Sequence, residues 1–274
     1  MYNFEKTMFY IYKVFREGNT RNIPLIKRSG AVWILGNGPS LKIQLKENID
    51  IFKRHELICV NHMADSKYFE ILKPEYYVMI DPAFYQDEKQ LSLYLRNIRN
   101  VTLSNLVKKV QWDMYLYLPK NAQNSCRIIE YLSENKNIKI KYISTCEFYG
   151  FQFIKKYLLD HQMCNFCCIN VLVVCLYVAI HMGYTNITLF GADHTWHKNL
   201  YITDDNRVAI YDSHFYGEKK KIVLEYDLGT ILRNISAALK SYYEINKYAL
   251  EKCVYIYNAT PGSYIDAFQR VKIF

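Results

Sequence analysis

The feature that most constrains this chain is a short apolar run that leads directly into a glycine-rich turn. Ala31 to Leu35 (AVWIL) is followed by the sequence GNGPSL at residues 36–41. A buried strand that ends in such a turn, with a helix after it, is how α/β nucleotide-binding folds begin. The pattern therefore predicts a parallel sheet with helices on its faces.

Further apolar runs recur along the chain, and each one ends in polar residues. Glu56 to Val60 ends at Asn61, Tyr76 to Ile80 ends at Asp81, and Asn186 to Phe190 leads into Gly191-Ala192-Asp193. Because the carboxyl ends of parallel strands lie at one edge of a sheet, we expect these polar side chains to converge there. The predicted fold is a single Rossmann-like α/β domain with a mainly parallel sheet flanked by helices.

The rest of the chain supplies less distinct elements. We expect strands at residues 101–103, 138–143 and 254–257, an apolar buried helix at residues 168–183, and a helix at residues 228–251. Residues 198–218 are polar and aromatic with no clear period, which favours a lid loop. The predicted organisation is an N-terminal amphipathic helix with its connection (1–29) and a nucleotide-binding catalytic domain (30–274).

The charge balance favours an anionic partner. Of the 274 residues, 35 are Lys or Arg and 26 are Asp or Glu, which gives a formal net charge of +9. The positive residues are scattered, whereas nucleic-acid binding usually needs a concentrated basic face. We therefore expect a phosphorylated substrate or a membrane surface, rather than a nucleic acid, as the anionic partner. The sequence is also compatible with an oligomer.

The start of the chain and the cysteines bear on its location. No secretory signal pattern is visible, and the apolar stretch from Ile169 to Met182 is shorter than the roughly 20 residues that span a bilayer. We expect a cytoplasmic protein with reduced thiols. Apolar residues lie near one face of the N-terminal helix, which either covers the core or rests on the anionic inner membrane; they are Phe4, Met8, Ile11, Tyr12 and Phe15.

Two roles are open for the turn after the first strand. Gly36 and Gly38 can let backbone N–H groups approach a phosphate at a helix N-terminus, or they can serve a tight structural turn. The third glycine of the dinucleotide fingerprint is absent, and Asn61 stands where its acidic ribose ligand is expected. No GxxxxGK[ST] is present, so a P-loop enzyme is excluded.

Histidines near the predicted strand ends are candidates for a general base, since the ordinary pKa of histidine lies near neutrality. His194 follows a strand end, and His214 lies beside Asp212 and Ser213. Asp193, His194 and His197 could also bind a metal, but their spacing matches no firm zinc pattern, so no metal is expected there. A second cluster, His161, Cys164, Cys167 and Cys168, is read as core packing, with a zinc site as the alternative.

Taken together, several of these segments resemble the bacterial lipo-oligosaccharide sialyltransferases. Ile34 to Leu41 resembles the opening motif of that family, Gly183 to Asp193 its helix-strand-GxD block, and Ser213-His214-Phe215 its Ser-His-Tyr element. The opening motif and the segment from Val60 to Pro82 are similar to a wider family. That family is the 6-hydroxymethylpterin diphosphokinase-like group, which includes flagellin-modifying glycosyltransferases. The likeness covers most of residues 31–268 in separated blocks.

The resemblance implies a GT-A-like domain that transfers a sialic-acid-like sugar from a CMP-activated donor to a cell-surface glycan during lipopolysaccharide synthesis. The implied reaction is an inverting displacement that needs no metal and no cofactor besides the donor. His214 would be the base, with His194 as its competitor, and Tyr201 would steady the departing phosphate. The implied nucleotide-binding residues are Gly36, Asn37, Gly38, Ser40, Asn61, Asp81 and Asp193. The sequence departs from the family at two places. Thr195 or Trp196 stands where the family has a second tyrosine, and Cys168 falls near the position of the family's donor-binding arginine.

Two other functions compete with this one. A diphosphokinase of the 6-hydroxymethylpterin type would use ATP and Mg²⁺ held by carboxylates such as Asp81 and Asp193. A nucleotide-binding protein without catalysis is the other alternative. It would bind the nucleotide, and His214→Ala would leave any measured turnover unchanged.

Overall fold

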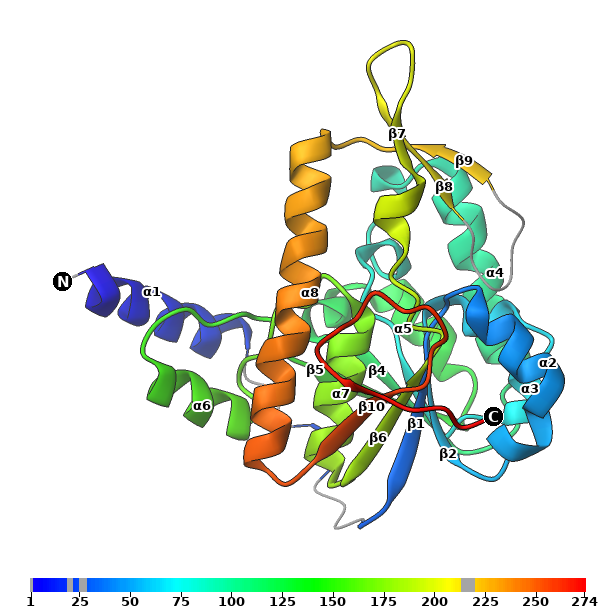
Figure 1. Cartoon of the computed structure of the whole chain (residues 1–274), viewed down its shortest axis with the longest axis horizontal. Helices are drawn as coiled ribbons and strands as arrows, with labels where there is room; N and C mark the ends of the chain where they lie inside the picture. Colours follow the sequence, from blue (N-terminus) through cyan, green and yellow to red (C-terminus); the bar gives the residue numbers. More distant parts are fainter. Residues whose placement is uncertain (1, 19–21, 25–28, 213–219) are drawn as a thin grey trace.

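The computed structural model describes residues 2–18, 22–24, 29–212 and 220–274. Its centre is an eight-stranded sheet in which every pair of neighbouring strands is parallel (Figure 1). Along the chain the strands are β1 (Ala31–Leu35), β2 (Glu56–Val60), β3 (Tyr76–Val78), β4 (Met114–Pro119), β5 (Ile138–Ile143), β6 (Asn186–Phe190), β10 (Tyr255–Asn258) and β11 (Gln269–Arg270). The predicted parallel α/β fold is confirmed.

The strand order in space, β11-β10-β6-β1-β2-β3-β4-β5, places β1 at a point of reversal. The chain adds β2 to β5 on one side of β1 and then returns to add β6 and β10 on the other side. The connections after β1 and β6 therefore lead to opposite sides of β1 from the carboxyl edge, where open α/β sheets bind their ligands.

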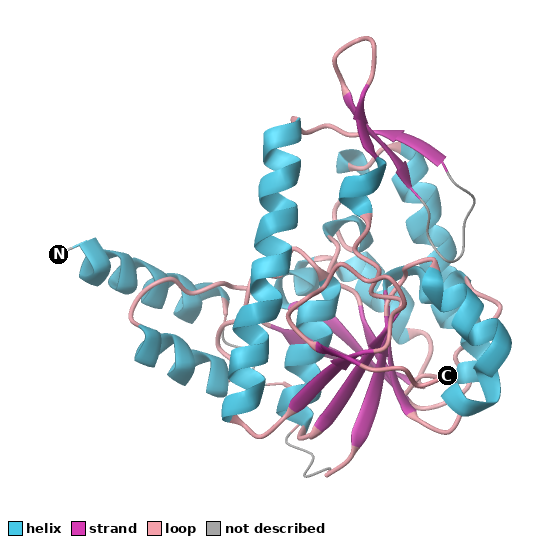
Figure 2. Cartoon of the chain, viewed as in Figure 1, coloured by secondary structure: helices cyan, strands magenta, loops and turns pink. Residues whose placement is uncertain are grey.

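Helices cover both faces of the sheet (Figure 2). Val32 and Ile34 of β1 belong to the core shared with α7 and α8, whereas Trp33 and Leu35 belong to the core on the opposite face, with α2 and α4. Since both faces are buried, each central strand is a continuous apolar run. The helices are α1 (Tyr2–Glu17), α2 (Ser40–Phe52), α3 (Phe69–Leu72), α4 (Leu93–Lys109), α5 (Cys126–Ser133), α6 (Gln152–Asp160), α7 (Val171–Met182) and α8 (Leu228–Glu251).

One predicted strand is wrong. Residues 101–103 lie inside α4, which begins after Ser92, whose hydroxyl accepts a hydrogen bond from the Leu95 amide. The β-branched residues Val101 and Thr102 favour a strand locally, but Thr102, Leu103 and Leu106 are buried on one side of this helix. Burial of that face outweighs local propensity.

The predicted lid loop is also wrong in its structure. The segment forms a short antiparallel sheet of β7 (Leu200–Ile202), β8 (Val208–Asp212) and β9 (Lys220–Val223), preceded by the 3₁₀ helix η5 (Trp196–Asn199). This sheet projects beyond the carboxyl edge of the main sheet (Figure 1). Val208 and Ala209 are buried apolar residues of this sheet, and because they are adjacent rather than alternating, the strands show no period of two in the sequence.

Helix α1 buries a different face from the predicted one. Val14 and Thr7 are buried against the body of the protein, and the Thr7 hydroxyl accepts a hydrogen bond from the Phe151 amide at 3.2 Å. Phe4, Met8, Tyr12 and Phe15 of the predicted stripe are between 51% and 65% exposed, and Ile11 alone packs against the core. Among the residues that the structure describes, no helix has the length and apolar character to cross a bilayer.

Candidate functional site

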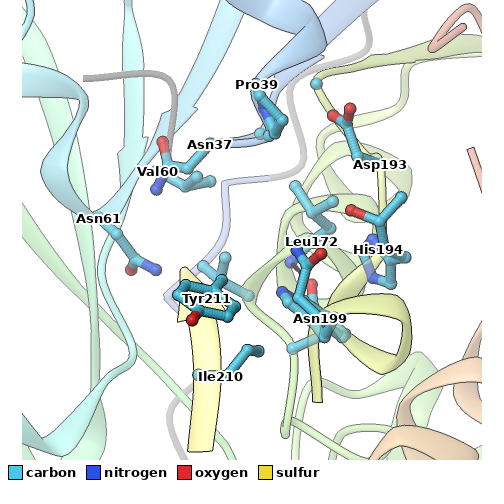
Figure 3. Close-up of a pocket in the computed structure, with 17 residues that line it drawn as sticks. Asn37, Pro39, Val60, Asn61, Leu172, Asp193, His194, Asn199, Ile210 and Tyr211 are labelled. Atoms are coloured by element: carbon cyan, nitrogen blue, oxygen red, sulfur yellow. Dashed lines mark hydrogen bonds between the residues drawn. The ribbon is translucent and has the colours of Figure 1, made fainter. Parts of the chain in front are cut away.

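A pocket lies at the carboxyl edge of the sheet, at the point of reversal beside β1 (Figure 3). The loops after β1, β2 and β6 supply one part of its wall, and the first turn of α7 supplies another. Element η5 and strand β8 close the remaining side. The lining residues are Gly36, Asn37, Gly38, Pro39, Val60, Asn61, Asn170, Val171, Leu172, Gly191, Asp193, His194, Thr195, Trp196, Asn199, Ile210 and Tyr211.

The two glycines after β1 allow a very close approach to the loop after β6. The Gly36 amide donates to the Phe190 carbonyl and the Gly38 amide to the Gly191 carbonyl, each at 2.8 Å. A Cβ on Gly36 would lie 2.5 Å from the Gly191 carbonyl oxygen, and one on Gly38 would lie 1.8 Å from the Asp193 carboxylate. The close packing of this turn against the loop after β6 therefore accounts for glycine at both positions, whether or not a phosphate also binds there.

Asp193 occupies the N-terminus of α2. Its carboxylate accepts a hydrogen bond from the Ser40 hydroxyl at 2.8 Å and one from the Ser40 amide at 3.3 Å. Burial raises the pKa of Asp193, and the bonds from Ser40 oppose that shift. An acidic side chain thus already caps the helix that was expected to receive the phosphate, and Ser40 is directed toward this carboxylate.

The N-terminus of α7 is the second helix end at the pocket. Val171 and Leu172 line the cavity, and the Asn170 side chain caps the helix by accepting from the Leu172 amide at 2.9 Å. The helix has 12 residues, so its dipole and its first amides favour negative charge at this end. A ligand phosphate is better accommodated beside α7 than beside the carboxylate at α2.

Two asparagines present buried amide groups to this pocket. The side-chain oxygens of Asn37 and Asn61 are buried and have no hydrogen-bond partner among the described residues. Asn61 also has a left-handed backbone, with φ of 46°. Its carbonyl accepts from the Tyr77 hydroxyl at 2.6 Å, and that hydroxyl accepts from the Ala64 amide at 2.8 Å. Buried polar groups without partners and strained backbones are common where a ligand completes the site.

His194 lines the pocket but is not suited to act as a base near neutral pH. It is 6% exposed, has φ of 54°, and its Nε2 lies 2.8 Å from the Tyr242 hydroxyl. Burial lowers the pKa of His194 to about 3. The imidazole is therefore neutral and held between the loop after β6 and α8, which favours a positioning role.

Several predicted site residues lie elsewhere. Asp81 caps the 3₁₀ helix η2 (Pro82–Phe84) by accepting from the Ala83 amide, and it does not line the pocket. Tyr201 and Ser40 do not line the pocket either. The Tyr201 ring stacks on Tyr211, and the Ser40 hydroxyl donates to the Asp193 carboxylate. His214 lies outside the described residues, so its role stays a prediction.

The two suspected metal clusters are not assembled. No group of three His, Cys, Asp or Glu side chains is arranged to hold a metal within the described ranges. Cys164 is buried and Cys168 is directed toward the Phe166 carbonyl, whereas the His161 ring stacks on Tyr157. The burial of Cys164 is consistent with core packing, whereas Cys167 and Cys168 are only partly buried.

Sequence inspection missed the wall contributed by η5 and β8. Trp196, Asn199, Ile210 and Tyr211 line the pocket, although the sequence suggested only a loop there. The available signal was the pair of aromatic residues Tyr201 and Tyr211, which lie on one face of the β7–β8 pair.

Comparison with known proteins finds likeness in structure alone. No protein-family model matches the chain, and no curated protein sequence matches it. Among solved structures, the MAf glycosyltransferase from Magnetospirillum magneticum AMB-1 is similar, with a TM-score of 0.52 and 12% sequence identity. The similarity covers 97% of this chain but only 38% of that protein. This chain thus has the fold of one part of a glycosyltransferase structure.

Proposed function

We propose that this protein is a glycosyltransferase that moves a sialic-acid-like sugar from a CMP-activated donor to a glycan acceptor. The observation that carries the proposal is the pocket at the sheet reversal. There, two asparagine side-chain oxygens that have no partner among the described residues and the first turn of α7 face a single cavity. Amides suit a nucleoside, and a helix N-terminus suits a phosphate. The fold shared with a glycosyltransferase structure and the sequence motifs support the same reaction class.

In this proposal the chain's own residues bind, orient and shield the donor. Asn37 and Asn61 contact the nucleoside, and the amides of α7 stabilise negative charge on the departing phosphate. The sugar carbon passes through an oxocarbenium-like state as the bond to the phosphate oxygen breaks. The acceptor oxygen attacks that carbon from the opposite face, and His214 takes the acceptor proton. The small sheet of β7 to β9 excludes water and limits hydrolysis of the donor.

Nucleotide preference is the first test of this proposal. CMP should raise the melting temperature more than CDP, UDP, GDP or ATP at equal concentration, because the motifs resemble those of enzymes that use CMP-activated donors and the chain has no P-loop lysine for a triphosphate. A ligand at 100 times its Kd adds about 2.7 kcal/mol to the free energy of unfolding, which a thermal-shift assay detects. Preference for ATP, with turnover that stops in chelator, would support the diphosphokinase instead. Full activity in chelator would exclude that alternative.

We also propose that α1 makes a peripheral contact with an anionic membrane surface. Its outward face carries five apolar side chains, Phe4, Met8, Phe9, Tyr12 and Phe15, each 51% to 65% exposed. Exposed apolar surface of this extent marks an interaction site. Three cations on the helix, Lys6, Lys13 and Arg16, outnumber the acids Glu5 and Glu17. Aromatic rings with basic residues are typical of helices that lie in the membrane interface.

Vesicle sedimentation tests this contact. The wild-type protein should bind vesicles rich in phosphatidylglycerol, and Phe4→Glu with Phe15→Glu should weaken binding at least tenfold by placing charge in the apolar layer. Leu250→Glu, at a 52% exposed position on α8, is the control and should bind like wild type. Equal binding by the double variant, or a dimer that forms through α1 in place of vesicle binding, would refute the proposal.

A further inference from the structure

Strand β8 places an exposed aromatic ring in the wall of the pocket. Tyr211 lines the cavity and is 48% exposed, between Asn61 on one side and Asn199 on the other (Figure 3). Other tyrosines of this protein, such as Tyr255 at 52%, are as exposed as Tyr211, but Tyr211 lines a cavity. Its position within the cavity suggests that a ligand covers it.

A second ring holds Tyr211 in place. Tyr201 of β7 pairs with Ala209 of β8, so Tyr201 and Tyr211 lie on the same face of this sheet. Their ring centroids are 5.0 Å apart and their planes differ by 19°, which is a stacked arrangement. The Tyr201 hydroxyl is itself buried. Tyr211 therefore has one face fixed against Tyr201 before any ligand binds, which lowers the entropy cost of using its remaining surface.

The neighbours of Tyr211 define what can lie against it. Asn37 and Asn61 offer amide groups to the edge of a ligand, and Val60 adds apolar surface to the same cavity. A planar heterocycle satisfies all three, because its edge hydrogen-bonds and its faces are apolar. A sugar ring presents hydroxyls around its whole edge and leaves less flat surface to stack.

We infer that Tyr211 is the stacking platform for the nucleobase, braced by Tyr201, while the asparagine amides read the edge of the base. This inference rests on the proposed function and adds to it a binding residue outside the recognised motifs. Stacking contributes affinity for any base, whereas the amides provide discrimination between bases. Tyr201 is then a positioning residue, which acts through Tyr211 rather than on the phosphate.

The experiment compares two ligands that differ by the base alone. Calorimetry measures the affinity of CMP and of ribose 5-phosphate for wild type, Tyr211→Ala, Tyr211→Phe and Tyr201→Ala. Tyr211→Ala should weaken CMP roughly tenfold to 100-fold and leave ribose 5-phosphate unchanged, because only CMP stacks. Tyr211→Phe keeps the ring and should bind CMP like wild type. Tyr201→Ala should give a smaller loss, again for CMP alone.

Tyr255→Ala is the matched control, since Tyr255 is 52% exposed at the opposite end of the sheet and should affect neither ligand. Equal loss of both ligands in Tyr211→Ala, or unchanged CMP affinity with a raised KM for the acceptor, would overturn the inference. Wild-type protein that binds no nucleotide would contradict the proposed function together with this inference. Wild-type binding that survives Tyr211→Ala contradicts this inference alone.

Discussion

The His214→Ala variant should turn over CMP-sugar donor 10²- to 10⁴-fold more slowly than wild type, with nearly unchanged affinity for CMP. General-base assistance typically contributes that factor, and it acts only as the acceptor proton moves. A histidine base with an ordinary pKa also gives an acidic limb near neutral pH in the rate profile. The measurement is kcat and Kd across pH for wild type and variant.

His194→Ala separates this assignment from its competitor. Because the pKa of His194 is lowered to about 3, its imidazole is neutral throughout the range in which a base would titrate. The variant should keep the acidic limb and lose stability, since the Tyr242 hydroxyl loses its contact with His194 at 2.8 Å and keeps only its bond to Asn170 at 3.0 Å among the described residues. The unfolded chain protonates this histidine before the native one does, so wild-type stability falls as pH decreases from about 6.5 toward 3. An acidic limb that disappears in His194→Ala alone would transfer the role to His194.

Gly38→Ala should produce the second large effect, on both stability and CMP binding. The new Cβ would lie 1.8 Å from the Asp193 carboxylate and 2.6 Å from the Gly191 carbonyl oxygen. The side chain can move, but the backbone carbonyl cannot without disturbing its bond to the Gly38 amide. Overpacking of this kind costs about 1–3 kcal/mol, which lowers the melting temperature by roughly 3–10 °C. CMP affinity should fall because Asn37 shifts with the turn.

Gly30→Ala is the matched control for that variant. Gly30 precedes β1, and a Cβ there would meet no atom of the described residues within 4 Å. The free energy of unfolding should stay within about 0.5 kcal/mol of wild type, and CMP affinity should not change. A Gly38→Ala protein that melts and binds CMP like Gly30→Ala would show that the turn is more adaptable than its contacts indicate.

The strands that the sequence predicted best are those at the centre of the sheet. The spans of β1, β2 and β6 match the apolar runs, because strands buried on both faces need apolar residues at every position. Strand β4 was missed because its sequence, MYLYLP, mixes tyrosines with apolar residues and follows a polar connection. These runs also located the pocket, since Asn37, Asn61 and Asp193 follow those three strands.

What the sequence could not show depends on contacts between distant residues. The bond between Asp193 and Ser40 joins loops 153 residues apart and changes which helix end is open to a phosphate. Burial of His194 beside Tyr242 changes a candidate base into a neutral side chain. The stack of Tyr201 on Tyr211 requires the β7–β8 register, which has no apolar periodicity to reveal it.

The position of β1 has a consequence for how the chain is synthesised. Val32 of β1 pairs on one side with Glu56 of β2, the chain's next strand, but on the other side with Ile187 of β6, which the ribosome makes much later. Until β6 emerges, a nascent chain can assemble β1 to β5 but leaves the backbone of β1 as an open edge, a template for pairing with other chains. Expression should thus depend on chaperones that shield this edge, and slow elongation between β5 and β6 should increase aggregation.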